Sequence, residues 1–345
     1  MLLIAFFAIF GLTSAQKVIN LNTLDTNPAE NLILASGNAS IYITASSDST
    51  NCLDKIVFST GGVNKTATEV MRTARFYPTT DLLRPWIVQG PVFVTISLAL
   101  VELVALTGSI YLTSATQAYD KNCLVFDLTK DQTISTSNAQ STIVILNSQY
   151  SEFPYISSYI SSWVQKIGQQ VYIFQGVPSD VSSESSPIFS NPFKTSNSVA
   201  QVTNVENFNL NLPIFYLEVY GGVSFKISPQ YVSIAGSRLS NEITTGFYMK
   251  SEKSTEANFQ VHPLTGHSSN ILGFNYIGDN IPANSYVTVG VRSLNGFASE
   301  HQFIGSNESY WQTNVGDPLT IKSTGTNWGQ FYIQYYVIES QPIAT

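Results

Sequence analysis

Three histidines, His262, His267 and His301, are the residues most suited to metal binding or acid–base chemistry near neutral pH. The segment His262-Pro-Leu-Thr-Gly-His267 could bring two imidazoles together across a turn. No third cysteine or histidine stands nearby, and the spacing matches no standard zinc pattern. We therefore interpret them as polar loop histidines and predict neither a metal site nor any other cofactor.

Two polar loops carry the oxygen ligands that calcium prefers. Asp48, Asn51 and Asp54 lie in the first loop, and Asp120 and Asn122 lie in the second. Asp and Asn are also favoured in turns for their backbone geometry. Calcium binding stays an open alternative to a purely structural loop.

Catalytic motifs of the common hydrolases, nucleotide-binding proteins and metalloenzymes are absent from the sequence. A Ser-His-Asp triad is assembled by the fold and not by spacing, and a pair of carboxylates could serve a glycosidase. We predict a protein without catalytic residues, with a secreted hydrolase acting on glycans or esters as the alternative.

Three tryptophans are candidate ligand contacts because they stand among loop residues: Trp86, Trp311 and Trp328. An exposed indole can stack on a sugar or anchor a protein partner. The alternative is that each is a core tryptophan at the end of a strand.

The composition argues against nucleic-acid binding. Charged residues make up 11% of the chain, and the formal net charge is −7. Nucleic-acid-binding proteins concentrate Lys and Arg on one face. The abundance of Ser, Thr and Asn predicts a surface rich in hydroxyl and amide groups, which also suits a structural component of an extracellular coat.

The first 15 residues form an apolar run that closes on small residues and is followed by Gln16-Lys17. This pattern predicts a signal peptide over 1–15 and a secreted, extracellular protein. Three sequons in the mature chain predict N-glycosylation at Asn38, Asn64 and Asn307.

Short runs of β-branched and aromatic residues, most of them bounded by Gly, Pro, Asn or Ser, predict strands. They cover 92–98, 142–146, 171–174, 214–219, 223–227, 286–291 and 330–338.

The apolar segment 92–112 has the length of a transmembrane helix. Its Thr, Ser and Gly residues and the lack of flanking basic residues favour two buried strands, or a strand followed by one turn of helix. We predict no transmembrane span, while peripheral membrane association stays open. Residues 155–167 place aromatic side chains at i, i+4 spacing, which predicts one short amphipathic helix.

An internal repeat relates residues 37–58 to residues 108–126. In each copy an Ile-Tyr strand runs into a polar loop and then into an Asn-Cys-Leu triplet, which contains Cys52 or Cys123. An even number of cysteines in an oxidising compartment favours a disulfide between them. The alternative is that each packs as a thiol.

Many strands with few helical patterns predict an all-β protein of tandem β-sandwiches with at most one or two short helices. We expect a first sandwich region over 16–177, a Ser/Pro-rich linker or loop over 178–198, and a second sandwich over 199–345.

The signal peptide, the Ser-Ile-Tyr strand that runs into Asn-Cys-Leu, and the Ser/Thr-rich β chain together resemble the secreted CUB-like proteins of nematodes. A standard CUB domain has four cysteines in two close pairs, so that disulfide pattern does not transfer to this chain. The resemblance implies jelly-roll-like β-sandwich modules without enzyme activity. It also implies recognition of an extracellular protein or glycan ligand, in innate immune or stress responses.

Overall fold

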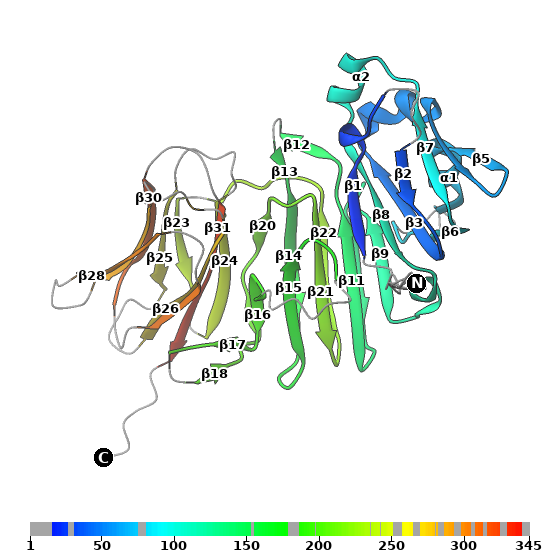
Figure 1. Cartoon of the computed structure of the whole chain (residues 1–345). Helices are drawn as coiled ribbons and strands as arrows, with labels where there is room; N and C mark the ends of the chain where they lie inside the picture. The colour runs from blue at the N-terminus through cyan, green and yellow to red at the C-terminus, as the bar shows by residue number, and fades with distance from the viewer. Residues whose placement is uncertain are drawn as a thin grey trace, which may run out of the picture. The chain divides into compact units, whose positions relative to one another are not determined.

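A computed structural model describes residues 16–26, 31–74, 81–152, 155–178, 186–196, 198–234, 236–241, 243–250, 257–264, 270–279, 281, 286–292, 298–304, 308–312, 316–324 and 330–339. These residues form β-sheets packed in sandwiches, with two short α-helices, which confirms the predicted all-β class (Figure 1). The predicted signal peptide 1–15 lies outside the described residues. The chain divides into two compact units: unit 1 comprises 1–76, 83–121 and 177–184, and unit 2 comprises 77–82, 122–176 and 185–345.

Unit 1 is a sandwich of two four-stranded sheets, ordered β1-β8-β3-β6 and β2-β7-β4-β5. Ile and Val side chains from both sheets, such as Ile43, Val94 and Ile110, are fully buried between them. The elements are β1 (Lys17–Asn20), η1 (Leu21–Thr23), β2 (Asn31–Leu34), β3 (Asn38–Ala45), η2 (Ser47–Lys55), β4 (Ile56–Thr60), β5 (Val63–Thr66), α1 (Ala67–Ala74), β6 (Trp86–Gln89), β7 (Val92–Ile96), α2 (Leu100–Ala105), β8 (Gly108–Ser114) and η3 (Ala115–Tyr119).

The segment 92–112 is strand β7, the short helix α2 and most of strand β8. This is the predicted strand followed by one turn of helix. Glu102 lies in α2, where its carboxylate accepts from the Lys55 ammonium at 2.6 Å and from the backbone N–H of Ala99 at 2.9 Å. These contacts lower the pKa of Glu102, the Lys55 hydrogen bond most of all.

Unit 2 begins with a sandwich of the sheets β10-β22-β14-β20 and β16-β15-β21-β11-β9. Its strands are β9 (Cys123–Asp127), β10 (Gln132–Thr136), β11 (Gln140–Leu146), β12 (Tyr150–Glu152), β13 (Tyr155–Ile156), β14 (Ser158–Val164), β15 (Gln170–Gln175), β16 (Phe189–Asn191), β17 (Phe193–Lys194), β18 (Val199–Ala200), β20 (Phe208–Leu210), β21 (Ile214–Tyr220) and β22 (Val223–Ser228). β12 pairs only with β13, and β17 only with β18, among the described strands.

The second sandwich of unit 2 packs the sheet β19-β24-β31-β26-β29 on the sheet β23-β25-β30-β27-β28. Its strands are β19 (Asn204–Val205), β23 (Ser237–Ser240), β24 (Thr244–Lys250), β25 (Asn258–Pro263), β26 (Asn270–Asp279), β27 (Tyr286–Arg292), β28 (Ala298–Phe303), β29 (Glu308–Gln312), β30 (Leu319–Thr324) and β31 (Gln330–Glu339). From β23 onward these strands run from yellow-green to red in Figure 1. We call the first of these sheets, which contains β31, sheet G.

Both faces of sheet G are buried. Phe331, Ile333, Tyr335 and Val337 of β31 face the core of the second sandwich. Tyr332, together with Phe247 and Met249 of β24, belongs to the core of the first sandwich instead. Sheet G is therefore a layer shared by the two sandwiches of unit 2.

All seven predicted strands are present, but the helix predicted over 155–167 is wrong. These residues form β13 and β14. Side chains four residues apart share a face in a strand as well as in a helix, so the aromatic spacing does not separate the two. The pairing of β14 with β22 shifts register between Ser161 and Val164, and Ser162 has a φ of 54°. This bulge turns both Ile160 and Trp163 into the core.

The first strands of the two repeat copies, β3 and β8, pair antiparallel in one sheet. Tyr42 stands opposite Tyr111 at the centre of the pairing, and the two rings stack with centroids 5.5 Å apart. A 3-10 helix follows each strand. The next strands then diverge, because β4 stays in unit 1 while β9 joins the first sandwich of unit 2.

The structure has no bond between Cys52 and Cys123, which the sequence predicts to form a disulfide. Cys52 packs half-buried against the core of unit 1, and Cys123 begins β9 in unit 2. The repeat places the two cysteines at equivalent points of the chain, but in different units.

The predicted domain boundary at 178–198 also differs from the structure. Residues 179–185 and 197 lie outside the described part, but 186–196 include β16 and β17. Strand β16 pairs with β15, and Phe189 is fully buried in the core of the first sandwich. The described half of this Ser/Pro-rich segment is therefore part of unit 2 and not a linker between domains.

Candidate functional site

A cavity of about 170 Å³ lies within unit 2, between β15 to β18 on one side and β26, β29 and β31 of sheet G on the other. We call it the Asn275 cleft. Its polar lining includes Ser190, Lys194, Asn275, Tyr310 and Gln334. Its apolar lining includes Pro187, Ile188, Pro192, Phe193, Val199 and Ile277. A mostly apolar pocket with a few polar groups is the usual form of a small-ligand site.

The strand register of sheet G aligns three polar residues in the cleft. Asn275 of β26 stands opposite Gln334 of β31 and opposite Tyr310 of β29. Directly opposed residues project from the same face of a sheet. Gln334, Asn275 and Tyr310 therefore form one row that crosses three strands.

Gln334, at the inner end of the row, forms hydrogen bonds with the neighbouring strand β16. Its Oε1 accepts the backbone N–H of Ser190 at 3.0 Å, and its Nε2 donates to the Ser190 carbonyl at 2.7 Å. The Nε2 also donates to Thr245 Oγ1 at 3.0 Å. This side chain fastens strand β16 to sheet G, and so it fixes one wall of the cleft.

Asn275 carries the same side-chain amide as Gln334, but the two amides differ in their hydrogen bonds. Its side chain is buried, with 8% exposed, and its Oδ1 accepts no hydrogen bond in the described structure. An unsatisfied buried acceptor costs about 1–3 kcal/mol of stability. Such groups are rare in native proteins and call for an explanation.

Tyr310 and Lys194 form the outer part of the cleft. The Lys194 ammonium lies over the Tyr310 ring, 5.2 Å from its centroid. The Tyr310 hydroxyl donates to Glu308 Oε2 at 3.1 Å. Burial and the nearby Glu308 carboxylate raise the pKa of Tyr310, so the phenol stays neutral at physiological pH. Lys194 is the one charged residue among the lining side chains.

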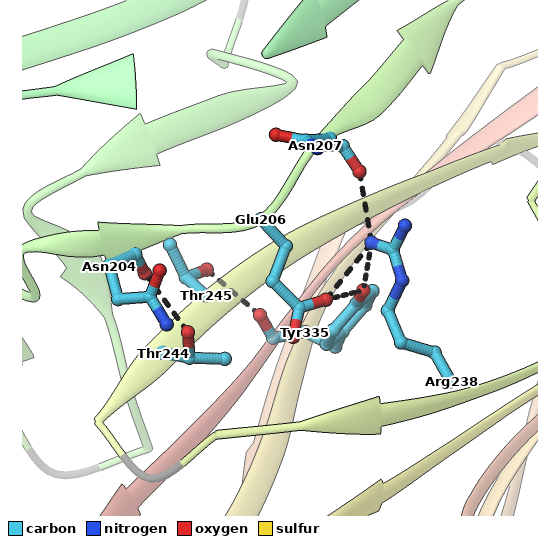
Figure 2. A network of polar contacts seen from close by, with 7 residues as sticks. All are labelled: Asn204, Glu206, Asn207, Arg238, Thr244, Thr245 and Tyr335. Atoms are coloured by element: carbon cyan, nitrogen blue, oxygen red, sulfur yellow. Dashed lines mark hydrogen bonds and ion pairs between the residues drawn. The ribbon is translucent and has the colours of Figure 1, made fainter. Parts of the chain in front are cut away.

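A buried polar network holds β19, β23 and β31 together on the other face of sheet G (Figure 2). Arg238 Nη1 contacts Glu206 Oε2 at 3.0 Å, the Asn207 carbonyl at 2.9 Å and the Tyr335 hydroxyl at 3.1 Å. Tyr335 donates to Glu206 Oε2 at 2.6 Å. Because Tyr335 is next to Gln334 in β31, this network fixes the strand that carries the inner end of the cleft row.

The network extends to the start of β24. Thr245 Oγ1 donates to the Tyr335 carbonyl at 2.8 Å, and Thr244 Oγ1 donates to the Asn204 carbonyl at 3.2 Å (Figure 2). Burial lowers the pKa of Arg238, but Tyr335 and Glu206 outweigh it and the net shift is upward. The guanidinium therefore stays charged.

A second hollow, of about 410 Å³, lies against β10, β14 and β22 of the first sandwich. It is lined by side chains such as Asp131, Tyr159 and Lys226. None of its lining residues carries a buried polar atom that lacks a hydrogen bond. It lacks the unmet polar group that distinguishes the Asn275 cleft.

Trp86, one of the predicted ligand contacts, belongs to unit 1 and does not line the cleft. Trp86 is half-buried against the core of unit 1, with its ring edge-on to Phe58 and the Lys65 ammonium 5.1 Å from its centroid. Trp311 belongs to β29, but its side chain is outside the described part, as is all of Trp328. The alternative, that this residue is a core tryptophan at the end of a strand, is therefore correct in part for Trp86.

The two described histidines, His262 and His301, have different neighbours. His262 Nδ1 lies 2.7 Å from Asp317 Oδ1, and His301 in β28 stacks near Phe303, while His267 is outside the described residues. Within the described part, no serine hydroxyl bonds His262, and no group of three His, Cys, Asp or Glu side chains could hold a metal.

Two of the three sequon asparagines are exposed. Asn38 begins β3 and Asn64 lies in the edge strand β5, whereas Asn307 is outside the described residues. Exposed side chains at both positions leave room for a glycan.

No residue of the cleft row is among the site residues predicted from the sequence. The available signal is the run Gly273-Phe274-Asn275-Tyr276-Ile277, in which an amide interrupts an apolar strand. Its meaning depends on Gln334 and Tyr310, which lie far away in the sequence and meet Asn275 only through the register of sheet G.

A family model described as "Glycoprotein: Transmembrane glycoprotein" matches residues 36–345. The chain belongs to this family. In the described part of this member of the transmembrane glycoprotein family, no helix has the length and apolar character needed to span a membrane. No curated protein matches the sequence.

Two solved structures also match the chain. The CUB1-EGF-CUB2 domain of human MASP-1/3 is 10% identical, with a TM-score of 0.20, and the match covers 60% of this chain and 99% of that one. A structure of an archaeal virus, described by its triple jelly roll fold and turret assembly, is 9% identical with a TM-score of 0.20. That match covers 96% of this chain and 85% of the viral chain.

Proposed function

We propose that the protein is an extracellular recognition glycoprotein without catalytic activity, and that it binds its protein or glycan ligand in the Asn275 cleft. The observation that carries this proposal is the buried Asn275 Oδ1, which has no hydrogen-bond partner among the described residues and belongs to a residue that lines a cavity. A ligand that donates a hydrogen bond there satisfies a group that the fold leaves unsatisfied.

Two further features support an extracellular role. The family is one of glycoproteins, and the sequon residues Asn38 and Asn64 are exposed. The resemblance to nematode CUB-like proteins extends the proposal to recognition in innate immune or stress responses. Secretion through the predicted signal peptide 1–15 is part of the same proposal.

The test uses the full-length protein, purified from a secreting cell and carrying a C-terminal tag. Its binding to a glycan array and to extracellular matrix is compared for the wild type, Asn275→Leu and Asn211→Leu. Asn211 also has a buried Oδ1 without a hydrogen bond, but it lies outside the cleft lining, so it is a matched control.

We expect binding by the wild type and by Asn211→Leu, and loss of binding by Asn275→Leu. Equal binding by all three proteins would show that recognition occurs elsewhere. Labelling of the wild type by a serine-hydrolase probe, or turnover of a glycan substrate, would contradict the non-catalytic part of the proposal.

A further inference from the structure

The Asn275 cleft contains a buried hydrogen-bond acceptor without a donor, and this acceptor limits the class of ligand that can bind. An asparagine side chain offers one carbonyl acceptor and two N–H donors. In Asn275 the carbonyl oxygen is buried without a donor. The ligand must therefore bring an N–H or O–H group to the row between Gln334 and Tyr310.

Gln334, opposite Asn275 in the next strand, shows how a side-chain amide in this row binds a peptide N–H. Its Oε1 accepts from the N–H of Ser190, and its Nε2 donates to the carbonyl of the same residue, which belongs to the next peptide group. The N–H of a ligand amide can donate to Asn275 Oδ1 in the way that the Ser190 N–H donates to Gln334 Oε1.

The size and walls of the cleft restrict what carries this amide. Its volume of about 170 Å³ is slightly larger than the roughly 150 Å³ cavity that accepts a benzene ring. One six-membered ring with a small substituent fits this space. An extended peptide, by contrast, binds along the whole edge of a sheet.

The apolar wall suits a methyl group and the C–H face of a ring, and it includes Ile188, Val199 and Ile277. The rim offers the Lys194 ammonium and the Tyr310 ring, which can contact ring hydroxyls and one ring face. A ligand with an apolar face, a secondary amide and several hydroxyls matches all of these surfaces.

We infer that the Asn275 cleft binds an N-acetylated pyranose, with the acetamido group paired to Asn275 and its methyl group against the apolar wall. This inference rests on the proposed function, because it assigns a ligand class to the same cleft.

The test is titration of the full-length glycoprotein with three small probes, followed by calorimetry and by saturation-transfer NMR. The probes are the methyl glycoside of N-acetylglucosamine, the methyl glycoside of glucose, and N-acetylglycinamide. The first carries both ring and amide, the second only the ring, and the third only the amide. Each is titrated into the wild type, Asn275→Leu and Asn211→Leu.

We expect the N-acetylated sugar to bind the wild type and Asn211→Leu at least about tenfold more tightly than the other two probes, as the loss of one buried hydrogen-bonded contact implies. Asn275→Leu should lose this binding while its melting temperature stays equal to that of the wild type or rises, since leucine removes the unsatisfied acceptor. Loss of binding is then not a loss of folding.

Three results would overturn the inference, and they bear differently on the proposed function. If glucose or the simple amide binds as well as the N-acetylated sugar, the ligand class is wrong. If no probe binds but Asn275→Leu still abolishes binding to matrix or to the array, the ligand class is wrong and the proposed function stands. If Asn275→Leu changes no binding of any kind, both fail.

Discussion

At the scale of single residues, the Tyr335 hydroxyl of unit 2 is an ionisable group inside a protein core. It is fully buried and lies between the Glu206 carboxylate and the Arg238 guanidinium. Burial first, and then the Glu206 charge, raise its pKa well above the ordinary value of 10.0. Burial likewise raises the pKa of Tyr216 and Tyr248 to about 12.

These shifts predict alkaline unfolding. A raised pKa means that the folded state holds protons that the unfolded state releases above pH 10.0. Stability is therefore intact below that pH and falls as pH rises toward 12, by up to about 1.4 kcal/mol per pH unit for each such tyrosine. We expect the urea midpoint to drop steeply above pH 10, together with a delayed rise in tyrosinate absorption.

The variant Tyr335→Phe provides the control for this prediction. It loses a hydrogen bond to a charged group, so its stability at pH 7 should fall by about 1.5–3 kcal/mol. Its stability should then decline less steeply with pH than that of the wild type, because one titrating group is gone. Equal slopes for the two proteins would show that Tyr335 does not contribute to alkaline unfolding.

At the scale of elements, helix α1 begins directly after the sequon Asn64-Lys65-Thr66. Thr66 Oγ1 accepts the backbone N–H of Glu69 at 3.2 Å, and Glu69 Oε2 accepts the backbone N–H of Thr66 at 2.8 Å. This reciprocal pair is a capping box. Thr66 thus serves both as the third residue of the sequon and as the cap of the helix.

Substitution of Thr66 should therefore have two separable effects. Thr66→Ala should abolish a glycan on Asn64 and destabilise unit 1 by about 1 kcal/mol through loss of the cap. Asn64→Gln should remove the glycan alone, and Thr66→Ser should retain both features. Peptide mapping measures the glycan, and thermal unfolding measures the stability. A Thr66→Ala protein as stable as Asn64→Gln would show that the cap does not matter.

Elements were predictable where a local pattern has a single structural meaning. The valines at every second position of 286–291 fit a strand, and β27 is present there. The i, i+4 spacing in 155–167 fits either a strand or a helix, and only the bulge at Ser162 and the pairing with β22 decide between them. The cleft row was not predictable, because Asn275, Gln334 and Tyr310 are brought together by strand register alone.

At the scale of the whole molecule, the order of the chain does not follow the division into units. The first strands of the two repeat copies lie in one sheet of unit 1, but β9, the next strand of the second copy, belongs to unit 2. Composition suggested a boundary at the Ser/Pro-rich segment, whereas the buried Phe189 ties that segment to the first sandwich. Local composition cannot show which sheet a short apolar run will join.

The shared position of sheet G predicts how the molecule unfolds. Phe247, Met249 and Tyr332 belong to the core of the first sandwich, although their strands also form one layer of the second. Neither sandwich of unit 2 can therefore lose sheet G without exposing the core of the other. Unit 1 has a hydrophobic core of its own.

Scanning calorimetry of the intact glycoprotein should accordingly show two transitions and not three. Ile143→Ala and Ile321→Ala remove fully buried side chains from the two different sandwiches of unit 2. Each should cost about 2–5 kcal/mol and lower the same transition. Phe58→Ala, in the core of unit 1, should lower the other transition. If Ile321→Ala instead separates a third transition that Ile143→Ala leaves unchanged, the two sandwiches unfold independently and sheet G does not couple them.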